Sequence, residues 1–145
     1  MMTADQIATI RSTWNLMGAT TDAVAPLFYD RLFALAPALR PLFPAGDLSG
    51  QAEKLGQTLA VVVKSLDDLP RLVPALEALG ARHAGYGVEA WHYDVVGQAL
   101  LETFAEVLGA HFTPAAREAW AAAYTTLAGV MVAAGDAAGN SARVA

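Results

Sequence analysis

The sequence predicts an all-α fold of about six to eight helices, built as a single domain over residues 1–145. Apolar residues recur at helical spacing along nearly the whole chain, and residues that cap or break helices separate the periodic stretches. Strand signals are almost absent, since the run Val61–Val63 is too short and lies within a helical pattern. We therefore expect helices packed ridges into grooves around one core.

The first two helices have recognisable signals at their ends. Thr3 and Gln6 have the form of a capping box, and Gly18 is placed to end the helix that they start. The second helix should cover about Thr21–Leu35, where Pro26 lies early enough to be tolerated. Both stretches carry apolar stripes, which predict a buried face.

The middle of the chain alternates helix with breaks. A prolyl segment, Pro37–Phe43, leads into a turn-rich loop, Pro44–Gly50. Helix returns over about Gln51–Leu66, and Asp67–Pro70 breaks it. Leucines at steps of four and three residues then predict a helix over Leu72–His83.

The last two helices are the longest. A glycine-bounded turn, Gly85–Gly87, precedes a stretch that keeps helical period over Tyr93–Leu108. Thr113 and Pro114 supply an N-cap and a proline at the first helical position of the final helix. Its tail, Asp136–Ala145, is rich in Ala, Gly and Ser, and we expect it to fray.

Composition excludes several classes of function. The net charge is -5 and the nine Lys and Arg residues are scattered, so the chain lacks the basic patch that nucleic-acid binding needs. The chain has no cysteine, which rules out disulfides, thiol catalysis, iron–sulfur clusters and cysteine-ligated zinc. No Gly-x-Gly-x-x-Gly follows a strand, which argues against a flavin or nicotinamide domain.

The sequence also favours a cytoplasmic location. The start, Met1–Asp5, lacks the basic residues and apolar run of a signal peptide. The longest uncharged stretch, Ala119–Gly135, is shorter than the ~20 apolar residues of a membrane span, so a buried core helix suits it better. Whether the protein is a monomer or a homodimer stays open.

Three histidines are the candidates for metal or catalytic chemistry: His83, His92 and His111. Glu89 with His92 is the one pairing within a helical turn, and it is a weak zinc signal because such a site needs more ligands. His83 differs because it continues an apolar stripe. Two interpretations stay open for it: a buried histidine bonded to a backbone carbonyl, or an axial ligand to an iron porphyrin.

Three more residues could face the same core as His83. Tyr29 follows Phe28 on the second helix, where a buried phenol needs a partner for its hydroxyl. Gln51 opens a helix and Phe43 lies in the prolyl segment. Taken singly, Gln51 is an ordinary cap-region residue and Phe43 an ordinary core aromatic. Their joint arrangement with His83 indicates a cofactor pocket.

The chain resembles a bacterial single-domain globin, of the kind related to the haem domain of flavohaemoglobins. The resemblance extends from the first helix to about Ala134. The residues that carry it, in order, are Leu27-Phe28-Tyr29-Asp30-Arg31-Leu32-Phe33, Arg40-Pro41-Leu42-Phe43, Arg82-His83, His92-Tyr93 with Val96-Gly97, and Ala119-Trp120 with Tyr124. It implies a globin fold around a haem pocket.

The resemblance also implies a role for each matched residue. His83 would be the proximal ligand to haem iron, and Phe43 would pack against the porphyrin. Tyr29 would place its hydroxyl at the distal side of the iron. Gln51 matches the distal polar position, and Leu55 would form the apolar distal wall.

The chain departs from the family pattern at the position of one glutamate. In the family, a glutamate near the end of the last helix pairs with the tyrosine that matches Tyr93, and the two orient the proximal histidine. Here that position falls on Gly135, with Asp136 beside it. Without that carboxylate, plain ligand binding is favoured over oxygen–oxygen bond cleavage. Lys54 could meet a haem propionate, although a solvated lysine is the simpler interpretation.

The implied function is a haem b (iron protoporphyrin IX) globin that binds dioxygen reversibly at five-coordinate ferrous iron, as an oxygen carrier, store or delivery protein. Carbon monoxide and nitric oxide are further expected ligands. The alternative is a nitric oxide dioxygenase with Tyr29 and Gln51 as distal catalytic residues. Each of its turnovers leaves ferric iron, so it would need an external reductase. Weak peroxidase activity and a haem-free helical docking domain are less favoured.

Overall fold

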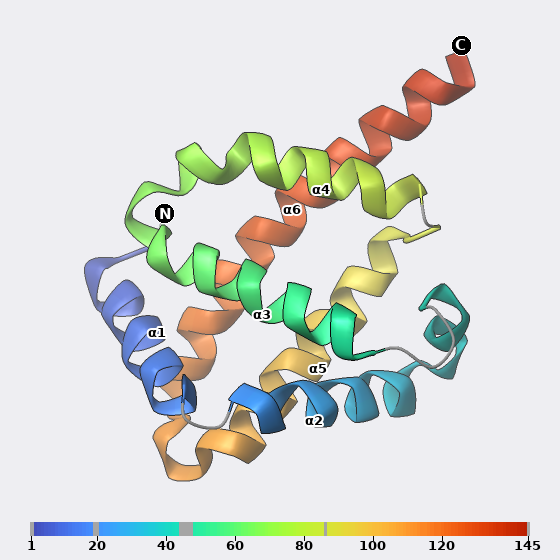
Figure 1. Cartoon of the computed structure of the whole chain (residues 1–145). Helices are drawn as coiled ribbons and strands as arrows, with labels where there is room; N and C mark the ends of the chain where they lie inside the picture. Colours follow the sequence, from blue (N-terminus) through green and yellow to red (C-terminus); the bar gives the residue numbers. More distant parts are fainter. Residues whose placement is uncertain (1, 19–20, 44–47, 86, 145) are drawn as a thin grey trace.

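The computed structural model of the chain describes residues 2–18, 21–43, 48–85 and 87–144. Within these ranges the protein is all-α, with six α-helices and three short 3-10 helices and no strand (Figure 1). The elements in chain order are α1 (Ala4–Met17), α2 (Thr21–Leu35), η2 (Pro37–Leu42), α3 (Ser49–Lys64), η3 (Leu66–Leu72), α4 (Val73–Gly85), α5 (Ala90–Leu108), η4 (Gly109–His111) and α6 (Pro114–Val144). The predicted fold class is confirmed.

Two predicted helix starts form as expected. The hydroxyl of Thr3 accepts a hydrogen bond from the Gln6 N–H at 3.1 Å, and the Gln6 side chain accepts one from the Thr3 N–H at 3.0 Å. At the start of α6, the Thr113 hydroxyl accepts from the Ala116 N–H at 3.1 Å. These bonds satisfy backbone donors that the first helical turn leaves unpaired.

Other predicted boundaries shift by a few residues. Helix α3 begins at Ser49, before the predicted Gln51, because the Ala52 N–H already bonds the Leu48 carbonyl at 2.8 Å. The predicted break after it forms a 3-10 helix, η3, that contains Pro70. Pro44–Asp47 of the predicted loop, and Tyr86 of the predicted turn, lie outside the described residues.

Helix α6 is longer than the sequence pattern indicated. It continues to Val144, through the segment after Asp136 in which we expect fraying. Ala119, Trp120 and Ala123 in the first half of this helix are buried, as expected for a core helix.

The helices pack in three main pairs. Helix α4 crosses α6, α2 crosses α5, and α1 also packs on α6 (Figure 1). Helix α3 contacts α1 and α2. Although α3 and α4 are linked only by η3, within the described ranges they make few close backbone contacts with each other. The fold thus keeps two consecutive helices apart and anchors each on different partners.

The centre of the core lies where α1, α5 and α6 meet. Ile10 is fully buried, and the Phe104 and Trp120 rings lie 4.7 Å apart between centroids. The indole N–H of Trp120 donates to the buried hydroxyl of Thr13 at 2.8 Å. Trp14 of α1 also belongs to this cluster, with its ring centroid 6.3 Å from that of Trp120.

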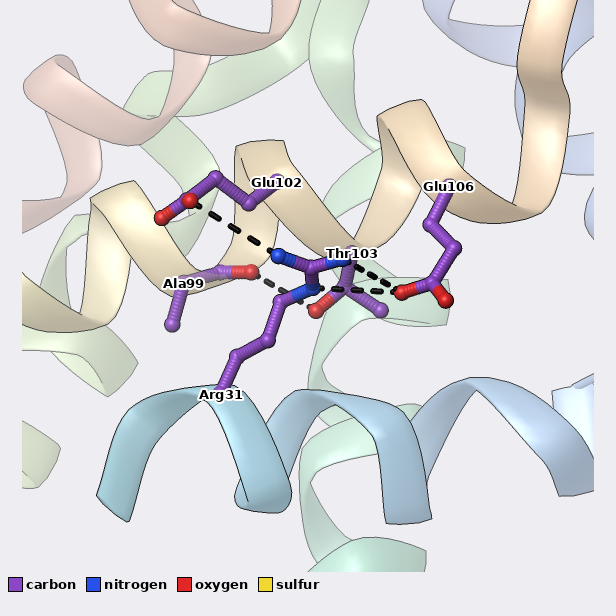
Figure 2. A network of polar contacts seen from close by, with 5 residues as sticks. All are labelled: Arg31, Ala99, Glu102, Thr103 and Glu106. Atoms are coloured by element: carbon purple, nitrogen blue, oxygen red, sulfur yellow. Dashed lines mark hydrogen bonds and ion pairs between the residues drawn. The ribbon is translucent and has the colours of Figure 1, made fainter. Parts of the chain in front are cut away.

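An ion-pair network ties α2 to α5 (Figure 2). Arg31 of α2 bonds the Glu106 carboxylate at 2.6 Å and lies 3.7 Å from that of Glu102. Both glutamates stand on α5, one turn apart, on either side of the guanidinium (Figure 2). Between them, the Thr103 hydroxyl donates to the Ala99 carbonyl at 2.7 Å within α5. These ion pairs therefore hold α2, the helix that carries Tyr29, against α5.

None of the helices in the described ranges has both the length and the hydropathy that crossing a bilayer requires.

Replacing Thr13 by Val should destabilise the fold. The substitution keeps the side-chain volume but removes the acceptor of the Trp120 indole N–H, leaving a buried donor unpaired. We expect the free energy of unfolding to fall by about 1–3 kcal/mol in urea titrations. Thr126→Val, at an exposed site where the hydroxyl bonds only its own helix, is the control and should change stability by less than about 0.5 kcal/mol. Equal effects in the two variants would contradict this account.

Candidate functional site

His83 stands near the end of α4 and is partly buried. Its Nδ1 lies 2.8 Å from the carbonyl oxygen of Leu79, one helical turn earlier. A neutral imidazole that donates from Nδ1 carries its lone pair on Nε2, which is the tautomer that a metal ligand needs. Both interpretations of His83 require a bond to a carbonyl. The Leu79 contact is compatible with either interpretation, and the ligand role of His83 stays a prediction.

Two tyrosines lie beside His83: Tyr93 of α5 contacts its ring, and Tyr124 of α6 bonds the Tyr93 backbone. The Tyr93 ring lies 6.3 Å from that of His83 between centroids, at an interplanar angle of 29°. The Tyr124 hydroxyl donates to the Tyr93 carbonyl at 2.6 Å. Burial raises the pKa of both phenols, so they stay neutral at physiological pH. A Cβ on Gly97 would lie 2.7 Å from the Tyr124 ring, so only glycine leaves space for this contact.

Tyr29 lies in a cluster of aromatic rings between α2 and η2. Its side chain is 5% exposed, and its ring makes edge-on contacts with Phe28 at 5.0 Å and Phe43 at 5.7 Å between centroids. Phe33 contacts both Tyr29 and Phe43. Within the described ranges the Tyr29 hydroxyl has no hydrogen-bond partner, although buried tyrosines ordinarily find one. The structure thus brings Tyr29 and Phe43 together and leaves one donor for a further group.

The three candidate residues on α3 differ in exposure. Gln51 is partly buried in the first turn, and Lys54 is exposed. Leu55 lines an apolar cavity of about 50 Å³ together with Phe28, the chain neighbour of Tyr29. Leu55 therefore shares the apolar surroundings of Tyr29. Within the described part of the chain, no hydrogen bond or ion pair joins Gln51 or Lys54 to Tyr29 or His83, and their roles stay predictions.

The expected carboxylate beside Tyr93 is not replaced by Asp136. Gly135 faces α4, where a Cβ would lie 3.3 Å from both the Ala84 Cβ and the Gly80 carbonyl oxygen. Asp136 is exposed, and among the described residues it makes no hydrogen bond or ion pair. The Leu79 carbonyl is the one acceptor that the structure shows for the His83 Nδ1.

The Glu89 and His92 pair serves a structural purpose. The Glu89 N–H donates to His92 Nδ1 at 2.8 Å, and the two residues form a capping box at the start of α5. Across the described ranges, no group of three or more His, Cys, Asp or Glu side chains could hold a metal ion. The weak zinc signal in the sequence is therefore a helix cap.

A model of the globin family matches residues 27–131. The all-α fold and this match together define a haem-binding class of protein. The chain belongs to the globin family.

Similar proteins include the Flavohemoprotein of Vibrio cholerae serotype O1, which is 34% identical over 134 residues. The Flavohemoprotein of Bordetella parapertussis is likewise 34% identical over 134 residues. Each alignment covers 91% of this chain. The chain spans about a third of the length of these relatives, 34% and 33% respectively. The likeness therefore concerns their globin portion, and the single domain over residues 1–145 stays a prediction.

Haem is the cofactor that membership of the family implies, and the residues present fit it. A His83 Nδ1 that donates to Leu79 leaves Nε2 for an iron ligand, and the hydroxyl of the buried Tyr29 side chain has no protein partner in the described ranges. Phe43 supplies an aromatic face beside Tyr29.

Sequence reasoning missed three supporting contacts: the Leu79 carbonyl, the Tyr124 bond to Tyr93, and the approach of Gly135 to α4. The first has a local signal, because residues four apart on a helix face each other. The other two join residues far apart in the chain, and nothing in local spacing reports them.

The stability of the protein should fall as pH rises from about 10 to about 12. Burial raises the pKa of Tyr29 to about 12 in the folded state, whereas its ordinary value is 10.0. In that window the unfolded state binds fewer protons, so stability that is complete below pH 10 is lost as the pH rises. Urea titrations at several pH values should show a falling free energy of unfolding, with a flatter slope in Tyr29→Phe. An equally steep slope in that variant would contradict the assignment.

Proposed function

We propose that this globin binds dioxygen reversibly at haem, with His83 as the proximal ligand and Tyr29 as the distal hydrogen-bond donor. The observation that carries the proposal is the hydroxyl of the buried Tyr29 side chain, which has no protein partner in the described ranges. Oxygen carriage, storage or delivery follows from such binding, and the cytoplasm stays the predicted location.

When bound, haem supplies an iron atom that takes diatomic gases and shifts negative charge onto dioxygen. His83 would hold that group through Nε2, while its Nδ1 hydrogen bond to Leu79 fixes the ring orientation. Tyr93 packs on the ring and limits its rotation. These contacts orient the imidazole without a carboxylate taking part in them.

Tyr29 is suited to stabilise dioxygen. With a pKa raised to about 12, its hydroxyl stays protonated at neutral pH and can donate a hydrogen bond. A bond to a charged acceptor is worth about 1.5–3 kcal/mol, which lengthens the residence of dioxygen by about tenfold to a hundredfold. Phe43 would pack against the porphyrin and Leu55 would form the apolar wall. Gln51 would add a second donor, and Lys54 would meet a propionate.

Nitric oxide dioxygenation with an external reductase is the second candidate. It is favoured by the similarity to flavohemoproteins, whose name indicates flavin as well as haem. The same Tyr29 donor would serve it. We rank it below oxygen binding because the structure shows no carboxylate beside His83: Gly135 faces α4 and Asp136 is exposed. Reductase partnership and weak peroxidase activity belong to this second candidate.

Replacing His83 by Ala should abolish stable haem binding. The change removes the proposed ligand nitrogen and leaves the α4 backbone in place. We expect purified His83→Ala to lose most of its haem absorbance while far-ultraviolet circular dichroism keeps its helical signal. His111→Ala, at an exposed site in η4, is the matched control and should keep its colour. Full colour with an unchanged spectrum in His83→Ala would overturn the proposal.

Replacing Tyr29 by Phe should speed dioxygen release by about tenfold to a hundredfold. Carbon monoxide gains little negative charge, so its release should change much less, and the comparison separates hydrogen bonding from packing. Stopped-flow release rates of both gases test this. Equal acceleration of the two would indicate a steric effect and would contradict the donor role.

Nitric oxide consumption separates the two candidate functions. The ferrous protein is supplied with nitric oxide, dioxygen and a crude cell reductase fraction. Oxygen binding as the main function predicts one rapid turnover per haem and then a slow rate. Sustained rapid consumption that depends on Tyr29 would make the dioxygenase the better assignment.

A further inference from the structure

Helices α4 and α6 cross with backbone in contact at Gly80. Gly80 is buried, and a Cβ on it would lie 2.6 Å from the Cα of Met131 and closer still to the Met131 carbonyl oxygen. One turn further along α6, a Cβ on Gly135 would lie 3.3 Å from the Ala84 Cβ and from the Gly80 carbonyl oxygen. Because glycine has no side chain, the backbones of α4 and α6 approach closely at both positions.

This crossing lies beside the residues that hold the His83 ring. On an α-helix, residues four apart share a face and consecutive residues are about 100° apart. Leu79 and His83 thus share one face of α4, and Gly80 and Ala84 share the next. The face that presents the imidazole and the face that touches α6 belong to the same turn. A shift of that turn moves the ring and its Leu79 acceptor together.

We propose that Gly80 and Gly135 are positioning residues for His83, setting where its imidazole stands by direct contact between the backbones of α4 and α6. The inference rests on the proposed role of His83 as the haem ligand. Within the described ranges α6 is the most extensive partner of α4, so the contact with α6 determines the position of this turn. In this chain a backbone contact takes the place of the carboxylate that the family resemblance puts at Gly135.

Because of this contact, an acidic side chain at position 135 would displace α4 as well as add a carboxylate. The first atom of any side chain there meets Ala84 at 3.3 Å, so α4 must move before a carboxylate could reach Tyr93.

Gly135→Ala is the direct test, in haem-saturated protein. One methyl group forces the α4 turn outward by a few tenths of an ångström, which strains the bond between His83 and the iron. We expect dioxygen release to rise by about threefold or more. The iron–histidine stretching band of the ferrous protein should shift to lower frequency. A merely structural role would lower the midpoint of thermal unfolding and leave both readouts unchanged.

Gly129→Ala is the matched control. It lies on the same helix, and a Cβ there meets nothing within 4 Å. Both substitutions gain similar helix propensity, about 1 kcal/mol, so the difference between them isolates the contact with α4. Adding Ala84→Gly to Gly135→Ala removes one of the two neighbours at 3.3 Å and should return the release rate towards that of the parent protein.

The outcomes separate this inference from the proposed function. If His83→Ala loses haem but Gly135→Ala behaves like Gly129→Ala in gas release and in the iron–histidine band, the positioning role is wrong and the ligand assignment stands. If His83→Ala keeps an unchanged haem spectrum, the proposed function itself fails. A release rate that Ala84→Gly does not restore would also contradict the positioning role.

Discussion

Helix α4 is anchored mainly by its backbone contact with α6, and the candidate site depends on that contact more than on any polar interaction. The His83 ring is oriented within its own helix by the Leu79 carbonyl, so whatever fixes the helix fixes the ring. On the opposite side, Tyr29 is held by aromatic neighbours and by the ion pairs of Arg31 with α5. The two halves of the site are thus built by different forces: close backbone packing on one side, aromatic and charged contacts on the other.

The sequence predicted the fold where the signals are local. The capping box at Thr3 and the cap at Thr113 depend on residues a few positions apart, and both appear as expected. The start of α3 and the extension of α6 were less accurate. These boundaries depend on whether one more backbone bond forms, which composition does not decide.

The residues of the candidate site also divide into those with a signal in the sequence and those without one. His83 could be chosen because it continues an apolar stripe, and Tyr29 with Phe43 because the family resemblance includes them. The resemblance included Gly97, but not the reason for a glycine there. It leaves space for the ring of Tyr124, which is distant in the chain. The approach of Gly135 to Gly80 was likewise invisible, because a glycine in sequence does not say what lies beside it. Contacts between distant helices require the fold itself.

The Gly80–Gly135 crossing also limits the routes by which this protein can change in evolution. A larger residue at position 135 meets Ala84 at once, whereas a smaller residue at position 84 meets no obstacle. A side chain at position 135 therefore shifts α4 by a few tenths of an ångström unless room is first made at position 84. A lineage that regained an acid beside Tyr93 would pass through a loosened crossing first, and the histidine would change its surroundings before it changed its charge partner.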